Sequence, residues 1–178
     1  MEYIDVIDEQ GKNTGEKIEK SKIYNGEDSW HRTIHVMIVN SKNEVLLQKR
    51  SNSKRVCPGL WDLSISSHVK AGEECIDAVK REALEELGIN IEEENLEYLF
   101  ELKSDNFEDG GVVYKEFCNV YILRLDIKLE DMILQEEEVE AVKWMSLNDF
   151  AHMVSSKSKD LINSYQMYEG IVNKLKNI

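Results

Sequence analysis

The chain has 178 residues, a formal net charge of −13, and 42% hydrophobic residues. That length fits one domain of ordinary size, and the hydrophobic share is enough for a buried core. The negative charge argues against a nucleic-acid or anionic-membrane partner, because both require a basic surface. A phosphorylated substrate would need positive charge supplied locally, and a cluster of carboxylates can supply it by binding Mg²⁺ or a similar cation.

Cellular location is indicated by what the chain lacks. No apolar run approaches the length of a membrane span, and residues 1–8 lack the basic and apolar regions of a secretory signal. Cys57, Cys75 and Cys118 form no CxxC pair and are too scattered for a disulfide framework or a structural zinc site. We therefore expect a cytoplasmic protein.

The first third of the chain is predicted to form strands. Residues 2–8 alternate apolar and acidic side chains, and residues 9–12 are typical of a turn. Residues 33–39 are β-rich, and residues 44–49 return after a short polar turn, so we expect a hairpin. A further strand is predicted over residues 60–69.

The hydrophobic period then changes to that of a helix. Between residues 74 and 87 apolar residues recur at three- and four-residue spacings, and Gly88 stands where a helix C-terminal glycine belongs. Ser146 or Asn148 could cap a later helix and Ser158 another. The predicted elements after the first helix are strands at 96–103, 112–125 and 139–145, then helices at 147–155 and 158–176.

This order of elements is not a regular βαβ alternation. We therefore predict an α+β fold with a mixed sheet and helices outside it. One domain should span residues 1–178, with a C-terminal helical tail over about 147–178.

An acidic cluster marks the predicted helix. Glu82 lies three residues before Glu85 and four before Glu86, so their side chains project from one side. Like charges at this spacing repel, and the helix gains nothing from them unless a cation neutralises them. A solvated acidic face is the ordinary alternative. Arg81 can pair with Glu73 or Glu85.

Residues 67–89 resemble the Nudix box. Its pattern is Gly, five residues, Glu, seven residues, then Arg-Glu-apolar-x-Glu-Glu-x-Gly-apolar, and every position matches except the first, which is Ser67. The resemblance implies an αβα sandwich and a Nudix hydrolase that cleaves a diphosphate linkage with Mg²⁺ or Mn²⁺. Because glycine tolerates backbone geometries that serine does not, we expect Ser67 to alter the local loop or the activity.

The resemblance also implies roles for single residues. It makes Glu73 and Arg81 orienting residues, and it makes three residues metal ligands: Glu82, Glu85 and Glu86. We expect catalysis to rest on Glu85 and Glu86, while the general base is not set by the box. Glu116, in an alternating segment, and Glu138, just before the strand at 139–145, are candidates for that base or for an extra ligand.

The flanks of the box resemble isopentenyl-diphosphate isomerase and its hydrolase relatives. The similar segments are residues 48–54, 58–62, 64–68 and 72–73. The isomerases carry a catalytic cysteine where this chain has Ser66, and they bind a metal through histidines and glutamates. His35, His68 and Glu116 match such positions, but two further ligand positions fall near Asp28 and at Tyr114.

Serine replaces cysteine poorly in an acid–base reaction at carbon, so we favour hydrolysis over isomerisation. The expected substrate is a small-molecule diphosphate, namely a nucleoside diphosphate derivative. The isomerase reaction and a non-catalytic nucleotide-binding domain are the alternatives, and a homodimer is left open. Arg50, Lys54 and His68 are candidates for substrate binding; surface charge and core histidines are the competing interpretations.

Overall fold

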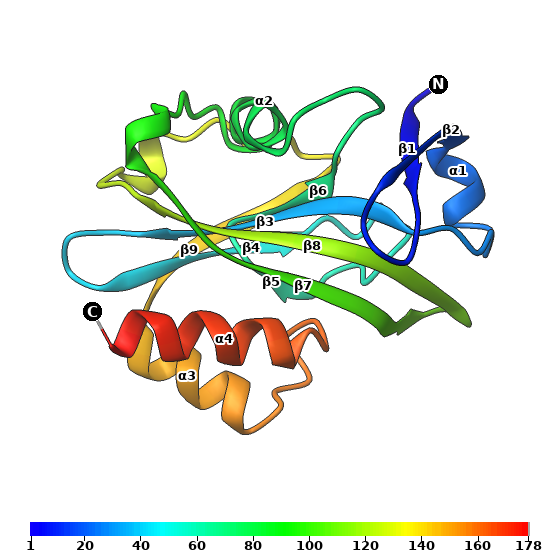
Figure 1. Ribbon diagram of the computed structural model, residues 1–178. Helices are drawn as coiled ribbons and strands as arrows, with labels where there is room; N and C mark the ends of the chain where they lie inside the picture. The colour runs from blue at the N-terminus through cyan, green and yellow to red at the C-terminus, as the bar shows by residue number, and fades with distance from the viewer. Residues whose placement is uncertain (178) are drawn as a thin grey trace.

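Three layers make up the molecule, and the computed structural model describes residues 1–177 of it. Helix α2 (Cys75–Leu87) covers one face of a seven-stranded mixed sheet, and α3 (Leu147–Ser155) and α4 (Tyr165–Lys176) cover the other (Figure 1). This arrangement confirms the predicted α+β fold and αβα sandwich. Ile178, the last residue of the predicted tail, lies outside the described residues.

Strand β3 (His31–Val39) is the centre of the sheet. It runs parallel to β8 (Val112–Arg124), which is antiparallel to β7 (Leu96–Asp109). On its other edge, β3 pairs antiparallel with β6 (Ile65–His68). The long β7–β8 pair confirms the two strands predicted there and extends the first one.

Strand β4 (Glu44–Arg50) follows β3 across the predicted turn. The hairpin is confirmed at its turn, where Val39 pairs with Val45. Farther along the strand, β5 (Trp61–Asp62) replaces β3 on that edge of β4, while β9 (Val139–Ser146) pairs with the other edge along its whole length.

The prediction of one strand over residues 60–69 is wrong, because that segment forms two short strands that pair with two different strands of the sheet. It breaks between β5, which pairs with β4, and β6, which pairs with β3. Ser64 lies buried at the break. Its hydroxyl accepts a hydrogen bond from Ile38 N at 2.8 Å and donates one to Leu46 O at 2.6 Å. The side chain thus satisfies the backbone groups where β3 and β4 separate.

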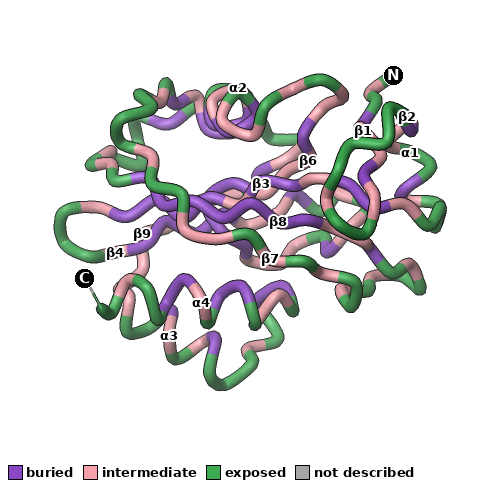
Figure 2. The backbone as a smooth tube through the Cα atoms, viewed as in Figure 1, coloured by how far each residue is buried: buried purple, intermediate pink, exposed green. Residues whose placement is uncertain are grey.

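The buried residues form a layer on each face of the sheet (Figure 2). On one face the apolar side of α2, including Val79, Ala83 and Leu87, packs against strands β3 and β4. This burial fixes the rotation of α2 and therefore the direction of its carboxylates. Gly88 ends the helix with φ 69°, and a Cβ there would meet Ile133 Cβ at 2.8 Å, so the predicted terminal glycine is confirmed.

The N-terminal segment forms a small sheet of its own. Strand β1 (Tyr3–Ile7) confirms the first predicted strand, whereas β2 (Asn13–Glu19) and the short helix α1 (Lys20–Ile23) were not predicted. Hydrogen bonds of 2.8 Å from Ala71 N to Tyr3 O and from Gly72 N to Asp5 Oδ2 attach this unit to the loop before α2.

The C-terminal helices differ in how they begin. Ser146 caps α3 by accepting a hydrogen bond from Asp149 N at 3.1 Å, as predicted. The prediction that Ser158 caps the last helix is wrong, because α4 begins seven residues later at Tyr165. The intervening segment is tied to the sheet instead: Trp61 N donates to Asp160 O at 2.8 Å, and Ile162 N donates to Trp61 O at 3.1 Å.

Two 3₁₀ turns, Glu93–Asn95 and Leu129–Asp131, complete the described elements. None of the helices within residues 1–177 combines the length and apolar character needed to cross a membrane.

Candidate active site

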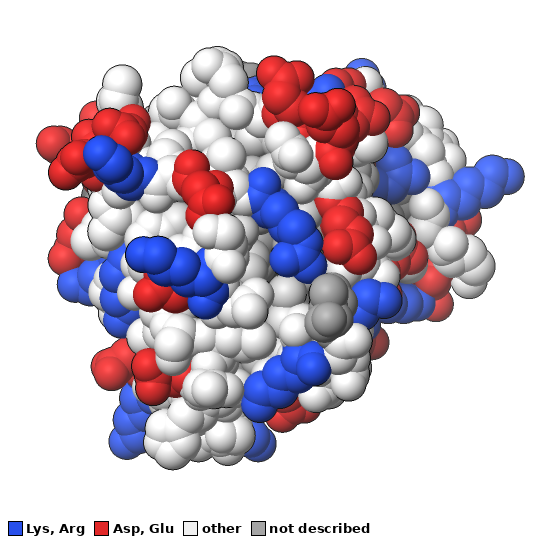
Figure 3. All heavy atoms as spheres, turned by 90° about the vertical axis from the view of Figure 1, so that its left-hand side faces the viewer, with Lys and Arg blue, Asp and Glu red and all other residues white. Residues whose placement is uncertain are grey.

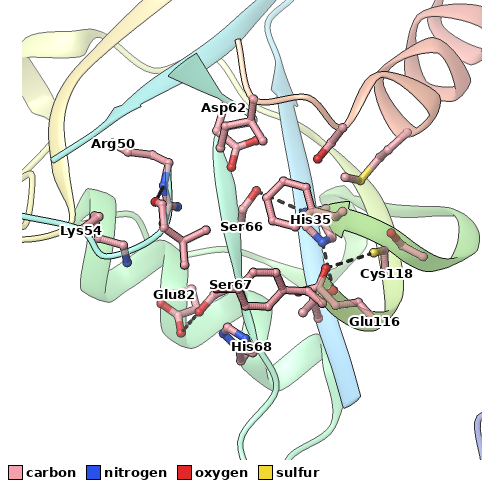
Figure 4. Close-up of a pocket in the computed structure, with 18 of the residues that line it drawn as sticks. His35, Arg50, Lys54, Asp62, Ser66, Ser67, His68, Glu82, Glu116 and Cys118 are labelled. Atoms are coloured by element: carbon pink, nitrogen blue, oxygen red, sulfur yellow. Dashed lines mark hydrogen bonds between the residues drawn. The ribbon is translucent and has the colours of Figure 1, made fainter. Parts of the chain in front are cut away.

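A cavity of ≈ 470 Å³ lies where α2, the N-terminal unit, the sheet and the start of α4 meet (Figure 4). It brings together residues that are far apart in the sequence. Glu73 lies outside its lining. The predicted site residues that line it are Arg50, Lys54, His68, Arg81, Glu82, Glu85, Glu86, Glu116 and Glu138.

Two carboxylates of α2 are buried at the wall of this cavity. Glu82 is 7% exposed and Glu86 only 4%, while the Glu85 side chain is about half exposed. Burial, and then the charge of Glu82, raise the pKa of Glu86 to about 8. Packed in this way, the pair is costly to ionise unless a cation shares the site.

Arg81 holds the carboxylates of the helix from behind. Its guanidinium donates to Glu73 through two bonds of 2.7 and 2.8 Å. Glu73 also accepts from Lys70 N, and these bonds outweigh partial burial and lower the pKa of Glu73. Arg81 further donates to Glu82, and to Glu85 at 3.3 Å. Both pairings considered for Arg81 are therefore present.

Ser67, at the position of the box glycine, contacts a carboxylate directly. Its hydroxyl donates to Glu82 Oε1 at 2.7 Å. The residue lies within β6, where an extended backbone suits any side chain, so the expected reshaping of the loop is not found. The structure replaces that expectation with a specific hydrogen bond to Glu82.

Cationic side chains enter the cavity from other elements. Lys54 forms an ion pair with Glu138, and Arg50 donates from Nε to Val56 O at 3.0 Å. Lys20, which the sequence analysis missed, also lines the cavity and pairs with Glu2 at 3.3 Å. Its position depends on the unpredicted β2–α1 unit.

A second group of possible ligands lies on β3, β6 and β8. The rings of His31 and His68 stack with centroids 5.1 Å apart, and His31 Nε2 lies 3.6 Å from Glu116 Oε1. Donor atoms of these three residues all lie within 4.8 Å of one another. Within residues 1–177, Nε2 of both histidines is buried without a hydrogen-bond partner. Burial, and then His31, hold the pKa of His68 well below its usual range, so a neutral, ligand-competent imidazole is favoured.

His31 was missed by the sequence analysis, which matched His35 and His68 to the histidines of the isomerases. His35 lies with Glu116 and Cys118 in another possible ligand group, which shares Glu116 with the group of His31. It contacts Thr33 Oγ1 at 3.0 Å and Ser66 Oγ at 3.3 Å. The sequence did hold a signal for His31: it stands four residues before His35, and in a strand residues four apart lie on the same face.

Asp28 and Tyr114, the two other positions of the isomerase set, belong to neither ligand group within residues 1–177. Asp28 is exposed and pairs with Lys115 at 2.7 Å. Tyr114 is buried and packs against Tyr24 and Phe107. The structure therefore supplies only part of the histidine and glutamate set expected of an isomerase.

Comparison with known proteins assigns the family. The NUDIX domain model matches residues 29–165. The chain is 34% identical over 160 residues to Nudix hydrolase 3 of Arabidopsis thaliana, covering 88% of this chain but only 21% of that protein. It is also 34% identical to isopentenyl-diphosphate Delta-isomerase 1 of Photorhabdus laumondii, covering 89% of this chain and 88% of that one.

A solved structure supports the same fold. The crystal structure of DR0079 from Deinococcus radiodurans has a TM-score of 0.74 and 20% identity, covering 99% of this chain and 98% of that one. Enzymes of the matched family generally use divalent metal ions and act on small diphosphates. The comparisons confirm the predicted Nudix hydrolase enzyme and its isomerase-like branch. The chain belongs to the Nudix family.

Proposed function

We propose that the protein is a metal-dependent hydrolase that cleaves the diphosphate linkage of a small molecule, a nucleoside diphosphate derivative. The observation that carries this proposal is the burial of Glu82 and Glu86 together at the cavity wall. Buried carboxylates of like charge are retained where a cation neutralises them.

The donor set fits a hard divalent cation. Glu82, Glu85 and Glu86 offer carboxylate oxygens, the ligands that Mg²⁺ and Mn²⁺ prefer. The pKa of Glu86, raised to about 8 by burial and then by the charge of Glu82, supports a cation at this pair. Such an ion would polarise the phosphoryl oxygens and lower the pKa of a bound water.

The side chains around the helix can carry out the remaining steps. Arg50 and Lys54 would bind the diphosphate oxygens, since charge-assisted hydrogen bonds to such oxygens are strong. If Lys54 turns to the substrate, its partner Glu138 is released and can take the proton of the attacking water. Water then bonds to phosphorus as the bridging P–O bond breaks. Glu116 is the second candidate for the base, and His68 borders the substrate.

Glu73 and Arg81 serve as orienting residues in this proposal. Their two hydrogen bonds hold the guanidinium against Glu82 and Glu85, and so limit the rotation of both carboxylates.

The wider setting is part of the same proposal. One domain spanning residues 1–178 works on a small molecule without nucleic acid or membrane, in the cytoplasm, as a monomer or a homodimer. The mixed charges on the face in Figure 3 fit that setting, because Lys and Arg side chains there stand among Asp and Glu.

A release assay tests the proposal. Phosphate or pyrophosphate release should be measured over nucleoside diphosphate derivatives, dinucleotides and diphosphate alcohols, with Mg²⁺ and with Mn²⁺. We expect Glu86→Gln to lower kcat by about 10³-fold, as for other removed charge stabilisers. Glu94→Gln, at an exposed position in the 3₁₀ turn after α2, is the matched control and should retain activity. Metal-independent release, or an active Glu86→Gln enzyme, contradicts the proposal.

One observation favours a second function, isomerisation of isopentenyl diphosphate. The cluster of His31, His68 and Glu116 supplies nitrogen and oxygen donors such as the isomerases use. Against it, Ser66 stands where the isomerases have their cysteine. Formation of dimethylallyl diphosphate from isopentenyl diphosphate with Mg²⁺ would support this alternative. Ligand binding in calorimetry without any turnover would instead support a nucleotide-binding domain.

A further inference from the structure

Asp62 is a buried carboxylate at the cavity that the proposed reaction does not use. It belongs to β5, is 5% exposed and lines the cavity. Its Oδ1 atom accepts two hydrogen bonds, one from Leu63 N at 2.7 Å and one from Tyr168 OH at 2.8 Å. Tyr168 lies on α4 and is fully buried, so the carboxylate is held in one orientation.

The second oxygen of Asp62 is available to a ligand. Among residues 1–177, no hydrogen bond reaches Oδ2 and no Lys, Arg or His forms a salt bridge with this carboxylate. Oδ2 is not one of the fully buried side-chain atoms that lack a partner, so it faces the open space of the cavity. A ligand that fills this space and displaces water from Oδ2 must supply a hydrogen-bond donor, because a carboxylate only accepts. Figure 4 shows the carboxylate directed into the cavity, toward Ser66.

The position of Asp62 separates it from the proposed diphosphate site. In Figure 4 it lies at the opposite end of the cavity from Glu82 and His68. A negative charge there repels phosphate, so this end is suited to the organic part of a substrate rather than to its diphosphate. An oxygen that only accepts hydrogen bonds selects a group that donates them.

We propose that Asp62 determines specificity by accepting a hydrogen bond from a hydroxyl or amino group on the organic part of the diphosphate substrate. The proposal rests on the proposed function, because it assumes a diphosphate bound at the α2 end. It assigns the substrate to diphosphates of sugars, nucleosides or amino compounds. Diphosphates of plain hydrocarbons are rejected, since they leave Oδ2 desolvated and unpaired, and sites built for a hydrogen-bond donor can reject such analogues by about 10⁴-fold.

Asp62→Asn tests this role with little change of shape. The asparagine oxygen can keep both bonds to Leu63 N and Tyr168 OH, which leaves its NH₂ group toward the cavity. The substitution thus turns an acceptor into a donor at the same place. Asp126→Asn is the matched control, because Asp126 is a surface carboxylate that hydrogen-bonds to Ser41.

The readout is the ratio of kcat/KM between two classes of probe. ADP-ribose and UDP-glucose carry hydroxyl and amino donors, whereas isopentenyl, dimethylallyl and geranyl diphosphate have none on their organic part. The native enzyme should favour a donor-bearing probe by at least 100-fold. Asp62→Asn should reduce that preference by at least 30-fold, with donor-free probes changed less than threefold. A merely structural role would lower both classes together.

Three outcomes bear on the proposal. Equal or better turnover of the donor-free probes by the native enzyme overturns it, and so does an unchanged preference in Asp62→Asn. If no probe of either class is hydrolysed, the proposed function fails and calorimetry with ADP-ribose and Mg²⁺ decides the role of Asp62. Binding at least 30-fold weaker in Asp62→Asn than in Asp126→Asn supports it, while equal binding or none to the native protein overturns it.

Discussion

At the scale of single residues, the departure from the Nudix box has a chemical consequence. Ser67 and Arg81 both donate to the same oxygen of Glu82, Oε1. Oε2 accepts neither bond and would be the oxygen available to the proposed cation, while the carboxylate is fixed by two donors instead of one. A glycine at this position has no side chain with which to make the first of these bonds.

Removing that hydroxyl should weaken metal binding. A hydrogen bond to a charged group contributes about 1.5–3 kcal/mol, and Arg81 still holds the same oxygen. We therefore expect Ser67→Gly and Ser67→Ala each to weaken Mn²⁺ binding about 3- to 10-fold, measured by titration with electron paramagnetic resonance. Native-like affinity in Ser67→Ala would show that the hydroxyl has no positioning role. A loss in Ser67→Gly alone would point to backbone flexibility instead.

Glu86 should oppose folding in the absence of metal. Burial and the neighbouring charge of Glu82 raise its pKa to about 8, so the folded protein disfavours the ionised form. Glu86→Gln keeps a polar side chain beside Gln48, whose Nε2 lies 3.5 Å from Glu86 Oε2, and removes the charge. With EDTA present, the variant should raise the free energy of unfolding by about 1–3 kcal/mol in urea denaturation. An equal or lower stability would contradict the idea that the site is strained without a cation.

At the scale of elements, the separation of β3 from β4 depends on one hydroxyl. Ser64 bridges Ile38 N and Leu46 O where the two strands diverge, and it is completely buried. Without it, a backbone donor and a backbone acceptor lose their partner at a buried site. The break also separates β5, which carries Asp62, from β6, which carries Ser67.

Ser64→Ala should therefore destabilise the fold by about 1–3 kcal/mol, the cost of buried polar groups left unsatisfied. Thermal and urea unfolding would measure the change. Ser41→Ala is the control, because Ser41 is exposed and its hydroxyl donates to the surface carboxylate of Asp126. It should stay within about 0.5 kcal/mol of the native protein. Similar losses in both variants would remove the special role of the buried bridge.

Local patterns were enough to predict some elements and not others. Helix α2 was predictable because its apolar residues keep one period and Gly88 ends it. Strand β2 was missed because its first five residues are all exposed, so its sequence does not alternate between polar and apolar residues. The start of α4 was misplaced because residues 160–162 pair with Trp61, a contact that no local sequence signal announces.

The same limit applies to the candidate site. Glu82, Glu85 and Glu86 lie on one helix, and their spacing alone placed them together. The pairing of Lys54 with Glu138 spans 84 residues, and that of Tyr168 with Asp62 spans 106. Partners at such separations are decided by the packing of whole layers, so the sequence could suggest the residues but not their contacts.

At the scale of the whole molecule, the net charge of −13 implies that the acidic side chains repel one another across the entire surface, and not only on α2. Both signs of charge share the surface shown in Figure 3, and several acids there have basic neighbours. The buried pair Glu82 and Glu86 is different, because mobile ions screen buried charges much less than exposed ones. Salt and a bound divalent ion should therefore stabilise the protein by distinguishable routes.

Matched ionic strength separates the two routes. NaCl should raise Tm gradually by screening surface repulsion, in the native protein and in Glu82→Gln alike. MgCl₂ at the same ionic strength should add a further saturable rise in the native protein only, because a ligand bound to the folded state stabilises it by about 2.7 kcal/mol at 100 times its Kd. Glu94→Gln, with one exposed charge removed, should respond like the native protein. Equal curves for NaCl and MgCl₂ in the native protein would mean that the acidic face of α2 is only solvated, which is the ordinary fate of such clusters. A magnesium-specific rise lost in Glu82→Gln would instead tie the stability of the whole fold to the carboxylates of one helix.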